Sequence, residues 1–261
     1  MRRIAIIFAA LAVVGFCLAP LFWLLTNSFQ SEDGHFTIAN YFSAFEQRAF
    51  GRAILNSFLV AGTTTLCCIA IGASAAFAIA RLEFVGRRAL LGIALAVSMF
   101  PPISTVSPLF LIIRGLGLRD TLGGLVLPYT IFALPLTLWV LSSFFREIPD
   151  ELYSAARVDG CSPFQAFRKI FLPLAIPGLA TTAILIFIFA WNEFLFALTF
   201  VSSPEKRTIP VAIALFATGQ KEPWPEIFAA SAVVTLPLVV LTILLQRKIV
   251  SGLTAGSVTG F

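Results

Sequence analysis

Six long apolar runs dominate the sequence, and they restrict the chain to the class of helical proteins that lie within a membrane. They occupy residues 4–25, 53–80, 89–113, 122–144, 176–201 and 227–245. A helix needs about 20 apolar residues to cross the hydrocarbon core of a bilayer. Charged residues make up 12% of the chain, against about 25% in a soluble domain. We therefore predict an all-α integral membrane protein, a single domain of six transmembrane helices.

The first apolar run admits two interpretations. Met1, Arg2 and Arg3 make a basic start, which is typical of a secretory signal peptide. The run that follows is longer than the roughly 7–15 apolar residues of such a signal, and no small-x-small cleavage site follows it. We therefore favour a permanent transmembrane helix over a cleaved signal.

The basic residues are unevenly distributed between the two sides of the membrane. With six spans, both termini lie on one side, and the loops of that side carry the larger share of the 18 Lys and Arg residues. Such residues accumulate in cytoplasmic loops, so we predict that both termini are cytoplasmic. No basic cluster lies on a soluble segment large enough to bind nucleic acid, which excludes that class of partner.

Sequence motifs of enzymes and metal sites are missing. There is no G-x-x-x-x-G-K-[ST] phosphate loop and no H-E-x-x-H zinc motif, and the sequence has one histidine. The four cysteines contain no C-x-x-C pair, which argues against a zinc site or a disulfide framework. We predict that the chain is not an enzyme, holds no metal and has no ATP-hydrolysing machinery of its own.

Two features interrupt the apolar runs. Two prolines within residues 99–104 remove backbone donors and predict a break in the third span, which marks either a cavity or a static kink. Glu193 is the one acidic residue within a span, and ionisable groups there usually face a cavity or a partner. We hypothesise that Trp191, Asn192 and Glu193 border a translocation pathway. The alternative is that Asn192 and Glu193 tie neighbouring helices together.

The loop between the fourth and fifth runs, residues 146–173, is too polar to span a membrane and carries the signals of two short helices. Pro149 suits the first turn of a helix, and Gly160 fits the C-terminal stop of that helix. Ser162 and Gln165 have the spacing of a Ser-x-x-Gln capping box, which predicts the start of a second helix.

The second helix of this loop carries an apolar stripe. Phe164, Phe167 and Phe171 recur at the spacing of one helix face, and Pro173 is expected to end the unit. Such an amphipathic helix either lies in the membrane surface or docks in a groove of a cytoplasmic partner. The residues alone leave both interpretations open.

The same loop resembles a known family motif. Residues 154–156 read Ser-Ala-Ala, Gly160 follows after three residues, and residues 170–173 read Ile-Phe-Leu-Pro after nine more. This spacing is similar to the EAA loop of bacterial ABC importer permeases, whose pattern is E-A-A, three residues, G, nine residues and I-x-L-P. Ser154 departs from the pattern, because the family usually has Glu there, so contacts specific to that carboxylate are not expected.

Further segments extend the resemblance over most of the chain, toward the smaller six-span subunit of carbohydrate permeases of the maltose/trehalose type. These segments are Asn56-Ser57, Ala80-Arg81-Leu82, Met99-Phe100-Pro101, Gly115-Leu116-Gly117-Leu118, Trp191-Asn192-Glu193-Phe194 and Gly252-Leu253-Thr254-Ala255-Gly256. The resemblance implies a type I ABC importer fold and a permease for a sugar, such as trehalose or maltose. The alternatives are a permease for a polyol or glycerol-phosphate type of solute and a self-contained secondary transporter.

The resemblance also implies partners in the bacterial plasma (inner) membrane. They are a second permease, two ATPase subunits that hold ATP and Mg²⁺, and an extracytoplasmic sugar-binding protein or lipoprotein. Residues 146–173 would contact the ATPase and couple its closure to movement of the spans. Residues 202–226 would face the binding protein, and residues 246–261 would reach the ATPase dimer as a flexible tail.

Individual loop residues acquire roles from the same resemblance. Gly160 would permit the sharp turn, while Phe164, Phe167 and Leu172 would fill an apolar cleft of the ATPase subunit. Asp159 and Arg168 would supply polar contacts at the rim of that cleft. The complete implied set of coupling residues is Ala155, Ala156, Asp159, Gly160, Phe164, Phe167, Arg168, Leu172 and Pro173.

Overall fold

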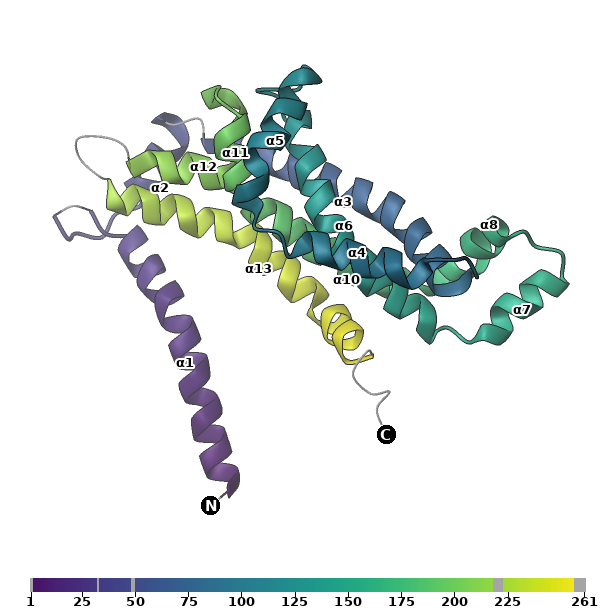
Figure 1. Ribbon diagram of the computed structural model, residues 1–261. Helices are drawn as coiled ribbons and strands as arrows, with labels where there is room; N and C mark the ends of the chain where they lie inside the picture. The colour runs from purple at the N-terminus through teal and green to yellow at the C-terminus, as the bar shows by residue number, and fades with distance from the viewer. Residues whose placement is uncertain (1, 32, 48–49, 218–222, 256–261) are drawn as a thin grey trace.

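The chain folds into an elongated bundle of helices (Figure 1). The computed structural model describes the backbone of residues 2–31, 33–47, 50–217 and 223–255, and their side chains except those of residues 2, 47, 88, 217 and 244–255. Within this part, helices are the only regular elements besides one isolated bridge between Gln30 and Phe36, which confirms the all-α prediction. Four helices are long and apolar enough to cross a membrane, or six spans exist if each of two bent pairs counts as one.

The centre of the bundle is the pair α3 (Phe50–Arg81) and α6 (Gly123–Glu147), with α10 (Ile176–Asn192) packed against both. A Cβ added to Gly72 on α3 would lie 2.4 Å from the Thr137 methyl group on α6. Small residues at such contacts let helix backbones approach closely, which is how membrane helices gain packing energy.

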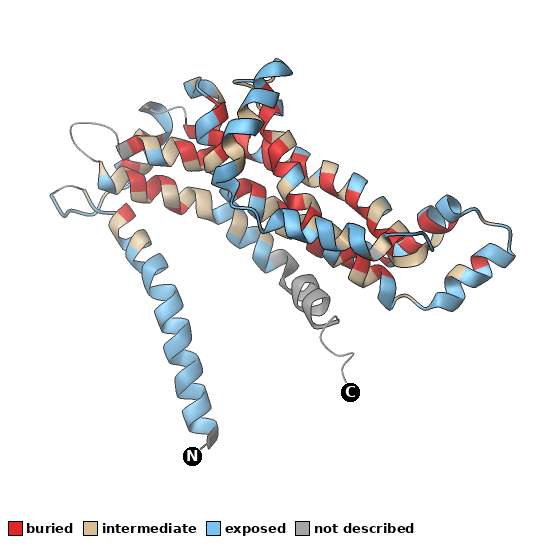
Figure 2. Cartoon of the chain, viewed as in Figure 1, coloured by how far each residue is buried: buried red, intermediate tan, exposed pale blue. Residues whose placement is uncertain are grey.

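The N-terminal helix α1 (Arg2–Ser28) diverges from the bundle and contacts α13 (Trp224–Ala255) near its own C-terminal end (Figure 1). The Trp23 and Phe228 rings meet there with their centroids 5.0 Å apart. Figure 2 shows the rest of α1 exposed on its visible side, and its large apolar side chains are exposed as well. An apolar helix with no buried face requires a non-aqueous environment, so lipid or another subunit covers α1.

The third apolar run is broken, as the sequence predicts. Helices α4 (Arg87–Ser98) and α5 (Pro102–Gly115) meet at an angle of 98°. Pro101 between them has extended backbone, with ψ at 124°. Extended backbone is the conformation that a following proline imposes, so the two adjacent prolines account for the break.

Two other runs differ from their predicted form. The run at residues 176–201, expected as one span, is divided, because α10 ends at Asn192 and a separate helix α11 covers Leu195–Phe200. The expectation of a flexible tail at residues 246–261 is wrong for residues 246–255, which continue α13. The rest of that expected tail, residues 256–261, lies outside the described residues.

The bundle has two distinct ends (Figure 1). The chain between α6 and α10 projects from one of them, which we call the loop end. The opposite end is formed by α2 (Ala39–Gln47), η2 (Pro204–Lys206), α12 (Ile209–Ala214) and η3 (Leu215–Ala217). Helix α12 belongs to the main hydrophobic core, so the predicted connection at residues 202–226 includes a folded part of the bundle.

Candidate functional site

Residues 149–175 project from the loop end, and we call them the α7–α8 segment. It contains α7 (Asp150–Val158), α8 (Pro163–Ala166), the π-helix η1 (Phe167–Phe171) and α9 (Leu172–Leu174). Figure 2 shows most of α7 exposed, while parts of α8 and η1 are buried toward the bundle. The segment therefore has a packed inner side and an open outer side.

Gly160 ends α7 in the left-handed region, with φ at +80°. The backbone N–H of Cys161 donates to the carbonyl of Ala156 at 2.9 Å, and the N–H of Gly160 donates to the carbonyl of Arg157 at 3.2 Å. This pair of bonds is the Schellman arrangement that satisfies the last carbonyls of a helix. The prediction that Gly160 stops the first helix of the loop is confirmed.

The start of α8 is a capping box, also as predicted. The Ser162 hydroxyl accepts from the backbone N–H of Gln165 at 3.2 Å, and the side-chain oxygen Oε1 of Gln165 accepts from the backbone N–H of Ser162 at 2.7 Å. The expectation that Pro173 ends the unit is wrong. Pro173 lies in the first turn of α9, where its missing N–H is tolerated, and the chain bends by 77° only afterwards, at Ala175.

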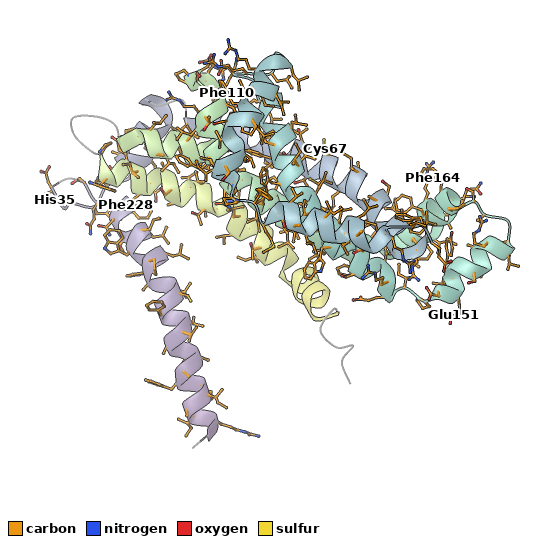
Figure 3. The ribbon with its side chains drawn as sticks, in the orientation of Figure 1. His35, Cys67, Phe110, Glu151, Phe164 and Phe228 are labelled. Atoms are coloured by element: carbon orange, nitrogen blue, oxygen red, sulfur yellow. The ribbon has the colours of Figure 1, made fainter. Side chains whose placement is uncertain are left out.

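The predicted stripe of phenylalanines divides between the two sides of the segment. Phe167 and Phe171 are 9% and 0% exposed and belong to a cluster with Phe77 of α3 and Phe145 of α6. Phe164 is 66% exposed (Figure 3). The expectation that Phe167 fills a cleft in a partner is therefore corrected, because its ring lies in the core of this chain.

The remaining predicted coupling residues also divide by burial. Ala156 is buried at 3% exposure, and Leu172 packs partly buried against the aromatic cluster. The exposed predicted residues, besides Phe164, are Ala155, Asp159, Gly160, Arg168 and Pro173. The outer side of the segment thus offers one apolar ring near side chains of both charges.

Arg81 fixes the α7–α8 segment to the bundle. It is the last residue of α3, its side chain is 4% exposed, and it donates to the carbonyls of Phe145 and Ile148 at the end of α6. It also pairs with Asp150, the first residue of α7, and its guanidinium carbon lies 5.1 Å from the centroid of the Phe171 ring. The Arg81 side chain of α3 therefore contacts α6, α7 and η1 at once.

The predicted pathway residues point in different directions. Trp191 is 2% exposed and its ring stacks on Phe187 with centroids 5.5 Å apart, so its indole lies in the core and not on an open surface. Asn192 is exposed and donates to the carbonyl of Ile188, one turn back in its own helix, at 2.8 Å. Asn192 is therefore the member of this trio most accessible to a solute.

Glu193 lies in the gap between α10 and α11. Its two carboxylate oxygens accept from the backbone N–H groups of Phe196 and Ala197 at 2.9 and 3.2 Å. These are free N–H groups at the start of α11, where a negative charge is favoured by the helix dipole. The carboxylate thus stabilises the break that divides the predicted fifth span.

Asp120 joins two loops at the opposite end. Its backbone φ is 56°, and its carboxylate accepts from the N–H groups of Ser202 and Ser203 at 2.9 Å each and from the Ser203 hydroxyl. The Lys206 ammonium lies 3.3 Å from the same carboxylate. The pKa of Asp120 is held below its ordinary value, chiefly by the hydrogen bonds from Ser203, because each bond favours the charged form.

Together these features define a class of protein. The structure has a bundle of apolar helices with broken spans, and a folded projection between two of them that is anchored on one side and open on the other. Within the described residues, no group of His, Cys, Asp or Glu could hold a metal ion. This combination is that of a multi-pass membrane protein with an exposed folded projection between two of its helices.

Comparison with known families agrees with that class. The family described as "Binding-protein-dependent transport system inner membrane component" matches residues 68–254. The chain belongs to this family and is a multi-pass permease subunit of a binding-protein-dependent ABC importer in the inner membrane. The resemblance inferred from the loop is thereby confirmed.

Individual relatives cover nearly the whole chain. The trehalose transport system permease protein SugB of Mycobacterium tuberculosis is 48% identical over 95% of this chain and 94% of its own length. The trehalose/maltose transport system permease protein MalG of Thermococcus litoralis is 41% identical over 100% of this chain and 98% of its own. A chain of a bacterial ABC transporter that imports alginate has the same fold, with a TM-score of 0.76 at 22% sequence identity. The superposition covers 94% of this chain and 96% of the alginate transporter chain.

Proposed function

We propose that this permease carries a sugar, a disaccharide such as trehalose or maltose, and forms half of the translocation pathway beside a second permease subunit. The observation that supports a sugar as the transported solute is the nearly full-length similarity to two relatives, one named for trehalose and one for trehalose and maltose. A further relative, 41% identical over 93% of this chain, is named for sulfoquinovosyl glycerol in Agrobacterium fabrum. These named cargoes share glycosidic hydroxyl-rich chemistry.

The energy for transport comes, in this proposal, from two separate ATPase subunits that hold ATP and Mg²⁺. The α7–α8 segment docks on one of them from the cytoplasmic side, which places both termini in the cytoplasm in accordance with the distribution of basic residues. Phe164, 66% exposed, enters an apolar cleft of the ATPase. Asp159 and Arg168, both exposed, contact the rim of that cleft.

The inner side of the α7–α8 segment supports this role. The rings of Phe167 and Phe171 lie 5.1 Å from that of Phe77 on α3, so a force on the segment acts on packed aromatic rings. Interiors of this kind are close-packed and transmit displacement. Closure of the ATPase pair then moves the spans as rigid bodies between inward- and outward-open states.

The sugar contacts proposed on this chain lie at the end of α10. Asn192 is exposed and its amide has donor and acceptor capacity for a sugar hydroxyl, while Trp191 packs behind it and Glu193 fixes the turn. Residues 202–226 face the binding protein in this scheme, because their described part, residues 202–217 and 223–226, lies at the end opposite the α7–α8 segment (Figure 1).

The test is purification of the tagged chain from its native membrane in mild detergent, with identification of its companions by mass spectrometry. ATP hydrolysis by the reconstituted assembly is then measured with the binding protein and, in turn, trehalose, maltose, a polyol and a glycerol-phosphate. Co-purification of a second permease and an ATPase, with stimulation by a disaccharide, supports the proposal. If only the polyol or the glycerol-phosphate stimulates ATP hydrolysis, the proposed disaccharide cargo is wrong. If no ATPase co-purifies, the proposed coupling to an ATPase is wrong.

A further inference from the structure

Helix α3 runs without interruption from one end of the molecule to the other (Figure 1). It has 32 residues, so at 1.5 Å per residue it is about 48 Å long. Its sequence contains no proline, the usual cause of a kink. An uninterrupted helix without a proline kink is suited to carry a displacement from one end to the other.

At the loop end, α3 is attached through Arg81. The ion pair with Asp150 contributes little by itself, because the Asp150 side chain is 90% exposed and exposed pairs are worth on the order of 0–1 kcal/mol. The stronger attachment is the buried guanidinium, which donates to two carbonyls at the end of α6 and lies over the Phe171 ring. Removal of these donors would leave two partly buried carbonyls without these partners, and an unpaired carbonyl shielded from water is costly.

At the opposite end, α3 is attached to residues 205–209 by two buried polar side chains. The Asn56 amide donates to the carbonyls of Glu205 and Arg207 at 2.9 and 3.0 Å. The Ser57 hydroxyl accepts from the N–H of Ile209, the first residue of α12, at 2.8 Å. Asn56 and Ser57 are 6% and 2% exposed, so water does not readily replace these bonds.

The middle of α3 is packed rigidly on α6. The Gly72 backbone lies against Thr137, and the buried Cys68 thiol donates to the carbonyl of Thr130 at 3.8 Å. Close-packed contacts of this kind transmit strain, which favours α3 and α6 acting as one unit between the two ends.

We infer that α3 is the link that transmits movement of the α7–α8 segment to residues 205–209, through Arg81 at one end and Asn56 and Ser57 at the other. This inference rests on the proposed function, in which the α7–α8 segment meets the ATPase and residues 202–226 meet the binding protein. Coupling between two sites is reciprocal. Engagement of the binding protein at residues 205–209 therefore reaches the ATPase contact along the same helix.

The test uses the complete transporter in lipid nanodiscs, with ATP hydrolysis measured with and without the sugar-loaded binding protein. Asn56→Ala and Ser57→Ala remove the attachment at the opposite end, and Arg81→Lys keeps the charge but loses the forked donors. Ser74→Ala is the matched control, because it lies on the same helix and its exposed hydroxyl bonds only to carbonyls of that helix.

The expected result is that the sugar-loaded binding protein no longer stimulates ATP hydrolysis fully, while the transporter subunits still assemble. Asn56→Ala and Ser57→Ala keep the subunit composition and the basal rate of ATP hydrolysis. In these variants and in Arg81→Lys, stimulation by the sugar-loaded binding protein falls by about 5-fold or more, within the usual range of allosteric coupling. Ser74→Ala behaves as wild type. The double variant of Ser57→Ala with Arg81→Lys loses no more than either single variant, because two breaks in one link are not additive.

Stimulation of Asn56→Ala and Ser57→Ala at the wild-type level would overturn the inference, as would losses that multiply in the double variant. If Asn56→Ala assembles poorly, Ser57→Ala decides the question, since it removes a single hydroxyl. A wild-type chain that binds no ATPase, or shows no stimulation, would instead refute the proposed function. The two failures are therefore distinguishable.

Discussion

Substitution of Gly160 separates a requirement for backbone shape from a requirement for a side-chain contact. Its φ is +80°, and a Cβ placed there would have no heavy atom within 4 Å. Gly160→Ala therefore meets no steric clash. Its only expected free-energy cost is that of the left-handed backbone conformation, about 1–2 kcal/mol. That cost lowers the population ratio of the native turn by about 5- to 30-fold. Gly160→Asn costs less, because asparagine tolerates this conformation.

Gly160→Pro is far more severe. Proline fixes φ near −65° and has no N–H, whereas the native φ is +80° and the N–H of Gly160 donates to the carbonyl of Arg157. The turn between α7 and α8 cannot form, so Phe164 loses its position relative to α7. We expect uptake to fall in the order glycine, asparagine, alanine, proline, with uptake abolished in the proline variant while membrane insertion is intact.

The assay is uptake of labelled trehalose by cells in which the variant is the only copy of the chain, with membrane amounts measured by immunoblot. Gly62→Ala is the control, because Gly62 lies in α3 with an ordinary helical φ and open space around its Cβ position. Normal uptake by Gly160→Pro, or equal loss in the asparagine and proline variants, would refute the reasoning.

Three further predictions concern packing and polar contacts. Gly72→Ala places a Cβ 2.4 Å from the Thr137 methyl group, so we expect a loss of about 1–3 kcal/mol from overpacking and a lower melting temperature in detergent than Gly62→Ala. Glu193→Ala removes the acceptor for two N–H groups of α11 and should lower the stability of the folded state by about 0.5–2 kcal/mol. Glu193→Gln keeps one acceptor oxygen. Normal transport with unchanged sugar specificity in the Glu193→Gln variant would argue against a pathway role for Glu193. Asp120 has a lowered pKa because Ser203 donates to its carboxylate, so its contribution to stability is present above the unfolded pKa of about 3.9 and is lost as the pH falls below it. Asp120→Asn should therefore lower the melting temperature at pH 7, and a difference from wild type that persists undiminished at low pH would contradict this cause.

Local signals were sufficient to predict several details of the α7–α8 segment and of the third apolar run. The capping box of Ser162 and Gln165, the stop at Gly160 and the break at residues 99–104 all depend on residues within one or two turns of each other. Such features are determined by backbone geometry and local hydrogen bonds. Sequence patterns therefore predicted them without knowledge of the packing.

Other details depend on distant residues and could not be predicted in the same way. The break after Asn192 has no proline or glycine to mark it and is stabilised by the Glu193 carboxylate. The resemblance implies that Phe167 fills a cleft of the ATPase, but the position of Phe77 on α3 makes Phe167 part of the core of this chain. The role of Arg81 depends on the end of α6, 64 residues away in the sequence. The sequence marked Arg81 only as part of the Ala80-Arg81-Leu82 segment of the family resemblance, which does not name its contacts.

The central claim, contact between the α7–α8 segment and an ATPase, is tested most directly by photo-crosslinking. p-Benzoylphenylalanine replaces Phe164 at the loop end or, as a control, Phe36 at the opposite end; the two side chains are 66% and 79% exposed. The intact transporter is irradiated and the crosslinked subunit is identified by mass spectrometry. We predict crosslinks to the ATPase from position 164 and none from position 36. No ATPase adduct at position 164, or equal adducts at both positions, would contradict the claim.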